Sequence, residues 1–91
     1  MRVVFTREAW RDYVFWQESR RDIIDRIDQL IADIQQSAFS GIGKPEPLRR
    51  EYAGWWSRRI TGEHRMVYRV TGSGSEQRIE ILSCRFHYTR R

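Results

Sequence analysis

The fold is set by residues 23–34, IIDRIDQLIADI, in which apolar side chains recur with the period of an α-helix. This apolar stripe follows the i, i+1, i+4, i+7, i+8, i+11 pattern and consists of Ile23, Ile24, Ile27, Leu30, Ile31 and Ile34. The pattern predicts a helix from about residue 20 to residue 36, with the stripe buried in the core. Just before it, Ser19-Arg20-Arg21-Asp22 resembles a capping box.

The residues on either side of this helix also carry local signals. Residues 2–6 are rich in β-branched and aromatic side chains, which predicts a first strand. Thr6 is a suitable N-cap for a helix over about residues 7–18, where Trp10 and Tyr13 recur at helical spacing. After the long helix, the glycines and prolines of residues 41–47, GIGKPEP, predict a loop.

From residue 52 onward, apolar and polar residues alternate and turn residues recur, which indicates strands. The expected strands are residues 55–61, 64–71 and 78–86. In the last of them, Ile79 and Ile81 are out of phase with Leu82, Cys84 and Phe86. A β-bulge near Leu82 would allow both sets to face the core.

The middle strand is expected to have one apolar face. The side chains expected against the helices are Met66, Tyr68 and Val70. Those expected toward solvent are Arg65, Val67 and Arg69. The order of elements predicts an α+β fold, in which an N-terminal strand and two helices pack on a small antiparallel sheet of three or four strands.

The chain has 91 residues, which is enough for one domain spanning residues 1–91. Its hydrophobic content of 40% is too high for a disordered chain, and no apolar run approaches the ~20 residues of a membrane span. The N-terminal apolar run is too short for a signal peptide. Cys84 is the only cysteine, so an internal disulfide is excluded. These features favour a cytoplasmic protein with no membrane partner.

The formal net charge of +5 is distributed unevenly along the chain. Residues 1–36 contain six basic and seven acidic side chains, whereas residues 37–91 contain eleven and five. The predicted sheet is therefore expected to form one basic surface. Sixteen of the seventeen basic residues are Arg, whose planar group fits phosphate oxygens, although a GC-rich genome would produce the same bias.

The candidates for proton transfer in this chain are Glu46, His64 and His87. Both histidines ordinarily titrate near neutral pH, and Glu46 is held between two prolines close to several cations. Taken alone, each also fits a solvated surface residue. Together with arginines on a basic sheet, one glutamate and one histidine form the minimum set for metal-free RNA cleavage. No cluster of metal ligands points to a metal instead, and no cofactor is implied.

Strand arginines and aromatic residues supply candidate RNA contacts. The arginines on predicted strands are Arg58, Arg59, Arg65, Arg69 and Arg85. Arg59 and Arg65 flank a turn, so they are expected near each other across a hairpin. The aromatic residues that are candidates for stacking on bases are Trp55, Trp56, Tyr68 and Tyr88. The alternative for the two tryptophans is that one packs in the core and the other covers an edge of the sheet.

Four segments of the chain, in order, closely resemble one protein family. They are GKPEPL at 43–48, GWWSRRIT at 54–61, EHRMVY at 63–68 and CRFHY at 84–88. The family is the YoeB/Txe toxins of the RelE/ParE superfamily of bacterial toxin–antitoxin systems. The resemblance implies a RelE-like, microbial-ribonuclease-like fold. It also implies a ribosome-dependent endoribonuclease that cuts mRNA in the A site, leaves a 2′,3′-cyclic phosphate or 3′-phosphate, and inhibits translation.

The resemblance also implies roles for individual residues. Glu46 is expected to act as the general base, His87 as the general acid, and Arg65 as the group that stabilises the transition state. The expected substrate-binding residues are Lys44, Arg49, Arg59 and Tyr88. Two features depart from the family pattern. Arg49 stands where the family commonly has lysine, and residues 89–91 extend beyond the final His-Tyr pair.

The family also implies partners. Besides mRNA and the 70S ribosome, a cognate antitoxin with an acidic, flexible C-terminal segment is expected to fold over Glu46 and His87 on the basic face. A homodimer is a further expectation, which exposed tryptophan would support. The alternative function is a non-catalytic ribosome- or nucleic-acid-binding inhibitor of the same fold, because fold alone does not fix chemistry.

Overall fold

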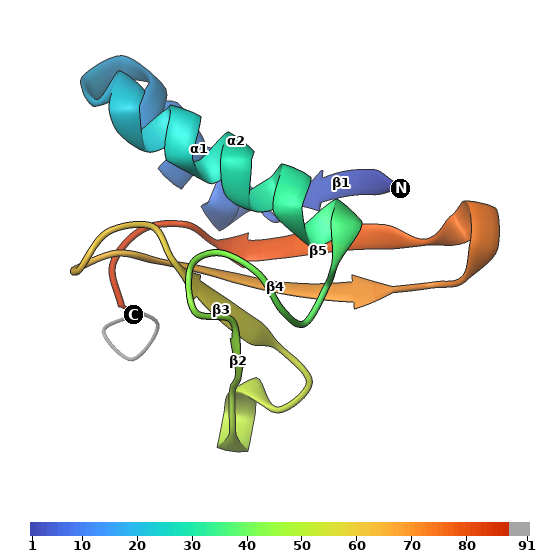
Figure 1. Ribbon diagram of the computed structural model, residues 1–91. Helices are drawn as coiled ribbons and strands as arrows, with labels where there is room; N and C mark the ends of the chain where they lie inside the picture. Colours follow the sequence, from blue (N-terminus) through green and yellow to red (C-terminus); the bar gives the residue numbers. More distant parts are fainter. Residues whose placement is uncertain (88–91) are drawn as a thin grey trace.

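The computed structural model describes residues 1–87, in which two helices cover one face of a five-stranded sheet (Figure 1). The helices are α1 (Arg7–Ser19) and α2 (Arg21–Gln36). The strands are β1 (Arg2–Phe5), β2 (Glu46–Pro47), β3 (Trp56–Arg59), β4 (Arg65–Thr71) and β5 (Arg78–Ser83). Short 3-10 turns lie at Arg50–Tyr52 and Gly74–Glu76. The predicted α+β class is confirmed.

Helix α2 buries the stripe predicted for it, because five of its six members are at most 4% exposed and Ile31 packs at the margin of the core. The predicted capping box is wrong. Arg20 is the N-cap residue and makes no side-chain cap hydrogen bond, and its guanidinium instead donates to the Asp22 carboxylate at 2.8 and 2.9 Å. The Ser19 hydroxyl donates to the Phe15 carbonyl at 2.6 Å. Ser19 ends α1, so the carbonyl one turn back is within its reach.

The predicted antiparallel meander is present as the four strands β2–β5, and β1 adds a fifth strand to the sheet. Its order is β1-β5-β4-β3-β2, with antiparallel pairs from β2 to β5 and a parallel pair between β1 and β5. Thr6 caps α1 as predicted by accepting the Ala9 amide at 3.0 Å. Its hydroxyl donates to the Leu82 carbonyl at 2.8 Å. The junction of β1 and α1 is thereby attached to the end of β5.

The edge strand β2 lies where the sequence predicts only a loop. Glu46 pairs with Ser57, and Pro47 pairs with Trp56 of β3. A proline is tolerated on an edge strand because its missing amide removes no hydrogen bond from an outer neighbour. Two residues are too few to show a period of two, which explains why the pattern did not predict this strand. Strands β3 and β5 also end earlier than predicted.

Strand β5 contains the predicted bulge. Val67 of β4 pairs with Ser83, but the next residue, Tyr68, pairs with Ile81, so Leu82 has no partner on β4. The shift brings side chains on both sides of it into the core. These side chains are Ile79, Ile81 and Cys84, each fully buried. The expectation that the whole second set faces the core is wrong, because Leu82 is only partly buried and Phe86 is exposed.

The outer face of the sheet, opposite the helices, is not uniformly exposed. The prediction that Val67 faces solvent is wrong, because its side chain is 1% exposed. Val67 lies in register between Ser57 of β3 and Ser83 of β5, which are 2% and 3% exposed. Arg65 and Arg69 stand on the same face of β4 and are partly exposed. The outer face therefore has a buried strip between its arginines.

Arg58 is expected on the basic surface, but the structure buries it completely. Strand alternation places Ser57 and Arg59 on the outer face, so Arg58 points toward the helices. The Arg58 guanidinium donates to the Asp33 carboxylate and to the Tyr68 hydroxyl. It also donates to the carbonyls of Ser37, Ser40 and Ile42. Tyr68 is therefore a core residue rather than a base-stacking one, and the Arg58 hydrogen bond lowers the pKa of Asp33.

Candidate active site

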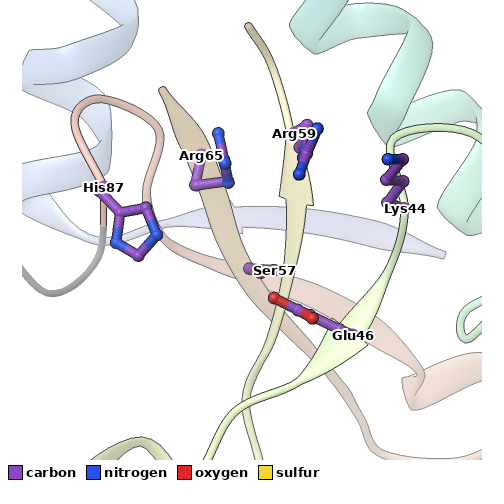
Figure 2. Close-up of a pocket in the computed structure, with 6 residues that line it drawn as sticks. All are labelled: Lys44, Glu46, Ser57, Arg59, Arg65 and His87. Atoms are coloured by element: carbon purple, nitrogen blue, oxygen red, sulfur yellow. The ribbon is translucent and has the colours of Figure 1, made fainter. Parts of the chain in front are cut away.

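A cleft of about 220 Å³ opens on the sheet (Figure 2). Its lining residues are Lys44, Glu46, Ser57, Arg59, Arg65 and His87. They come from the loop before β2, from β2, β3 and β4, and from the segment after β5. Five of the seven predicted site residues thus lie around one cleft.

Strand register brings the central members of the site together. Glu46 of β2 pairs with Ser57 of β3, and Arg59 of β3 pairs with Arg65 of β4. The second pair confirms the expected approach of these arginines across the hairpin. Ser57 is almost fully buried and was not predicted as a site residue. Its position two residues before Arg59 in a strand, and hence on the same face, was the available signal.

Glu46 is placed by the segment that precedes it. The Arg59 amide donates to the Gly43 carbonyl at 2.6 Å, which ties this segment to β3. Lys44 then has φ of +51°, in the left-handed region that non-glycine residues rarely adopt. In Figure 2 the Glu46 carboxylate points toward Ser57, and Lys44 lies on the other side of Arg59 from Arg65. Glu46 is exposed, so its carboxylate is open to a ligand in the cleft.

Arg65 is oriented by the turn between β3 and β4. Its Nη1 atom donates to the carbonyls of Thr61 at 2.9 Å, and of Gly62 and His64 at 3.2 Å each. Among residues 1–87, its Nε and Nη2 atoms make no hydrogen bond. One side of the guanidinium is therefore fixed by the backbone, and the other nitrogens remain available to a phosphate oxygen.

His87 reaches the cleft from the segment that follows β5. The residue before it, Phe86, has φ of +63°, which is a second left-handed non-glycine residue beside the site. The Arg65 amide donates to the Phe86 carbonyl at 3.0 Å. The backbone of β4 therefore holds the segment that carries His87. In Figure 2 the His87 imidazole lies on the opposite side of Arg65 from Arg59.

One predicted site residue that the structure describes, Arg49, does not line the cleft. Arg49 is exposed and lies between β2 and the turn at Arg50–Tyr52. Tyr88 lies outside the described residues. His64, the other candidate histidine, also stays out of the cleft, because its ring packs edge-on against Trp16 with 4.8 Å between ring centroids.

The other basic residues of the sheet have separate roles. Arg69 and Arg78 donate to the Glu80 carboxylate at 2.6 and 2.8 Å, and the Arg69 hydrogen bond lowers the pKa of Glu80 most. Arg69 also lies over the Trp55 ring, 4.3 Å from its centroid. Trp56 packs against the core. For Trp56, the alternative that one of the two tryptophans is a core residue rather than a base-stacking one is therefore confirmed. These arginines stabilise the sheet away from the cleft.

Within residues 1–87, no group of three or more His, Cys, Asp and Glu side chains is arranged to hold a metal ion. No helix in the described part of the chain is both long enough and apolar enough to cross a membrane.

Comparison with known proteins places the chain in a family. Residues 5–88 match the family described as YoeB-like toxin of bacterial type II toxin-antitoxin system. Toxin YoeB of Escherichia coli K12 is 46% identical over 88 residues, which are 97% of this chain and all of the relative.

Solved structures agree with this comparison. A YoeB/ParE toxin from Agrobacterium tumefaciens is 55% identical, with a TM-score of 0.94 over 97% of this chain and 100% of that one. A YoeB from Staphylococcus aureus, solved as a dimer, is 37% identical, with a TM-score of 0.87 over 97% of this chain and 98% of that one. The chain therefore belongs to the YoeB-like toxins of bacterial type II toxin–antitoxin systems.

Proposed function

We propose that this toxin is a ribosome-dependent endoribonuclease that cuts mRNA in the ribosomal A site. The observation that carries the proposal is the meeting of Glu46, Arg65 and His87, from three separate segments, around one cleft. Glu46 is the only carboxylate among the described lining residues, and it lies among cations that favour a bound phosphate. The cytoplasm, where ribosomes work, is the corresponding location.

The proposed reaction requires only these side chains and the RNA itself. The Glu46 carboxylate removes the proton of a 2′-hydroxyl, and the 2′-oxygen attacks the adjacent phosphorus. Protonated His87 donates its proton to the 5′-oxygen as the P–O bond to that oxygen breaks. Arg65 stabilises the added negative charge on the five-coordinate phosphorus. The products are a 2′,3′-cyclic phosphate, which water converts to a 3′-phosphate, and a 5′-hydroxyl.

The ribosome is expected to supply the orientation that the cleft alone does not provide. The lining side chains are polar or charged, and strands β2 and β3, which contribute to the cleft, are short, so free RNA has few surfaces that fix its backbone. Lys44 and Arg59 are expected to hold phosphates, and Arg49 and Tyr88 are expected to assist in binding the substrate. Holding the 2′-oxygen in line with the scissile bond is worth several orders of magnitude in rate.

The test is single-turnover cleavage of a defined mRNA on programmed ribosomes. Glu46→Gln and His87→Ala are each expected to slow cleavage about 10²–10⁴-fold, because each removes one proton-transfer group. Glu76→Gln, an exposed carboxylate in the β4–β5 connection, is the matched control and should cleave at the wild-type rate. Thermal unfolding of all three variants should show that the fold persists. Wild-type cleavage by both site variants would overturn the assignment.

Mapping the 3′ end of the mRNA separates this function from the alternative. A cleaved end within the A site supports the nuclease. A ribosome stalled on intact mRNA supports a binder that inhibits by occupancy.

The partners of the toxin are proposed on the same basis. A Staphylococcus aureus relative, 37% identical, was solved as a heterotetrameric YoeB-YefM toxin-antitoxin complex, and it was also solved as a dimer. We expect a cognate antitoxin whose acidic segment covers the cleft around Glu46 and His87. For a homodimer, an exposed aromatic surface exists on α1, where Trp10 is 53% exposed and stacks on Tyr13.

A further inference from the structure

The segment that carries His87 is held by contacts at each of the three preceding residues. The Asp12 carboxylate accepts the Cys84 amide at 3.0 Å, and the Trp16 indole donates to the Cys84 carbonyl at 2.9 Å. The Arg85 guanidinium lies over a ring of α1, 3.5 Å from its centroid. Phe86, in contrast, is held by residues at the start of β4 rather than by α1.

Phe86 is held at both of its backbone polar groups by two consecutive residues. Its amide donates to the His64 Nδ1 atom at 2.8 Å, and its carbonyl accepts the Arg65 amide at 3.0 Å. The left-handed φ of Phe86 costs about 1–2 kcal/mol for a residue with a side chain. These two hydrogen bonds compensate for that strain and set the direction in which the chain continues to His87.

The His64 side chain is itself fixed in place. It is 13% exposed, and its ring contacts the Trp16 ring. The His64 amide donates to the Thr61 hydroxyl at 3.0 Å, and its carbonyl accepts the amides of Ile60 and Thr61. The imidazole therefore offers its Nδ1 atom from a rigid position.

The hydrogen bond defines the protonation of His64. A backbone amide only donates, so Nδ1 must carry a lone pair and the neutral ring must hold its proton on Nε2. Burial lowers the pKa of His64, which favours this neutral form. Glu63, 3.8 Å from Nε2, opposes the shift. The surrounding cations that lower the pKa of His64 further are Arg85, Arg20 and Arg65.

We propose that His64 is a positioning residue for His87. Its neutral imidazole accepts the Phe86 amide and so aims the following histidine into the cleft. This inference rests on the proposed function, in which His87 donates a proton to the leaving oxygen. His64 and Arg65 then form one unit, in which a side chain and a backbone amide hold the acid while the Arg65 guanidinium faces the phosphate.

The variants His64→Asn and His64→Leu separate this role from simple packing. The Asn Oδ1 atom takes the place of Nδ1 as an acceptor, whereas Leu keeps apolar volume without one. On programmed ribosomes, the Leu variant should cleave about 10²-fold more slowly at saturation, since a misplaced acid loses about that factor. Its half-saturating concentration should change less than about twofold. The Asn variant should recover most of the rate, and Glu63→Gln should match wild type.

A spectroscopic measurement on the wild-type protein needs no variant to fold. The ¹⁵N shifts of His64 at neutral pH should show the tautomer with its proton on Nε2, with a scalar coupling from the Phe86 amide to Nδ1. A charged ring, or a proton on Nδ1, would overturn the proposal. Equal losses in the Asn and Leu variants, or a Leu variant at the wild-type rate, would overturn it as well. If the Leu variant cleaves at the wild-type rate and His87→Ala is inactive, the proposed function stands but the positioning role of His64 does not. Wild-type cleavage by His87→Ala would overturn both the proposed function and the role of His64.

Discussion

Replacing Arg58 by methionine removes the most highly connected buried charge in the described part of the protein. Methionine keeps the length of the apolar stem, so the core around β3 stays filled. What is lost is a guanidinium whose Nε atom donates to the Tyr68 hydroxyl at 3.1 Å and whose Nη1 atom donates to the Asp33 carboxylate. The backbone acceptors it also serves are the carbonyls of Ser37 at 2.7 Å, Ser40 at 2.8 Å and Ile42 at 3.1 Å.

The size of the loss follows from which acceptors are left without a donor. The Asp33 side chain is 29% exposed, so water replaces part of the hydrogen bonding that its carboxylate loses. The three carbonyls and the Tyr68 hydroxyl are part-buried or buried, and each loses a charged donor worth about 1.5–3 kcal/mol. Such losses are not additive, and breaking a buried charge network typically costs about 3–5 kcal/mol. For a domain of about 90 residues, this lowers the unfolding midpoint by at least about 12 °C.

Urea unfolding followed by circular dichroism measures the change. Arg59→Met is the matched control, because Arg59 follows Arg58 in the same strand but is exposed. Its substitution should lower the free energy of unfolding by about 0.5 kcal/mol or less. If Arg58→Met lost less than about 1 kcal/mol, water would have replaced the guanidinium without penalty. The conclusion that Arg58 holds the loop between α2 and β2 would then be refuted.

Two further predictions concern titration and association. Burial, and then its hydrogen bond to Asp28, raise the pKa of Tyr13 to about 12, so folding favours the neutral phenol. This contribution to stability is complete below pH ~10, the ordinary pKa of tyrosine, and is lost as the pH rises toward 12. The absorbance titration of the wild-type protein minus that of Tyr13→Phe should show a midpoint near 12. A midpoint near 10 would contradict the prediction. Association with an acidic antitoxin segment should slow as salt rises, because the ions screen the cations around Glu46; stopped-flow rates that do not change with salt would exclude electrostatic steering.

Local periodicity predicted the elements whose side chains repeat. The α2 stripe and the alternation of β4 each gave enough repeats to predict the element and the face that packs in the core. The alternation did not predict that Val67, on the outer face of β4, is buried as well. The bulge at Leu82 followed from two apolar sets that no single phase could bury. The pairing of β1 with β5 did not follow, because these strands lie near opposite ends of the chain. The pairing of β2 with β3 did not follow, because β2 has only two residues. Neither leaves a signal within the short strands themselves.

The site was predicted only as far as its residue types allowed. The composition of residues 37–91 supplied the candidates, and the family resemblance supplied their roles. The register supplied what neither contained, namely that Glu46 pairs with Ser57. It also confirmed the approach of Arg59 and Arg65 that the turn between them had predicted. Arg49 was predicted from the family resemblance, yet the chain turns after β2 and carries it away from the lining of the cleft.

Consecutive arginines show why charge had to be divided by face rather than by position in the sequence. Arg58 and Arg59 contribute equally to the net charge, but strand alternation sends one into the core and the other into the cleft. The buried arginine binds the carbonyls of the loop that leads to Lys44 and Glu46, and the exposed one binds the Gly43 carbonyl through its backbone. Both therefore position the Glu46 segment, and of the two only Arg59 presents its guanidinium to the cleft, where the proposed function places an RNA phosphate.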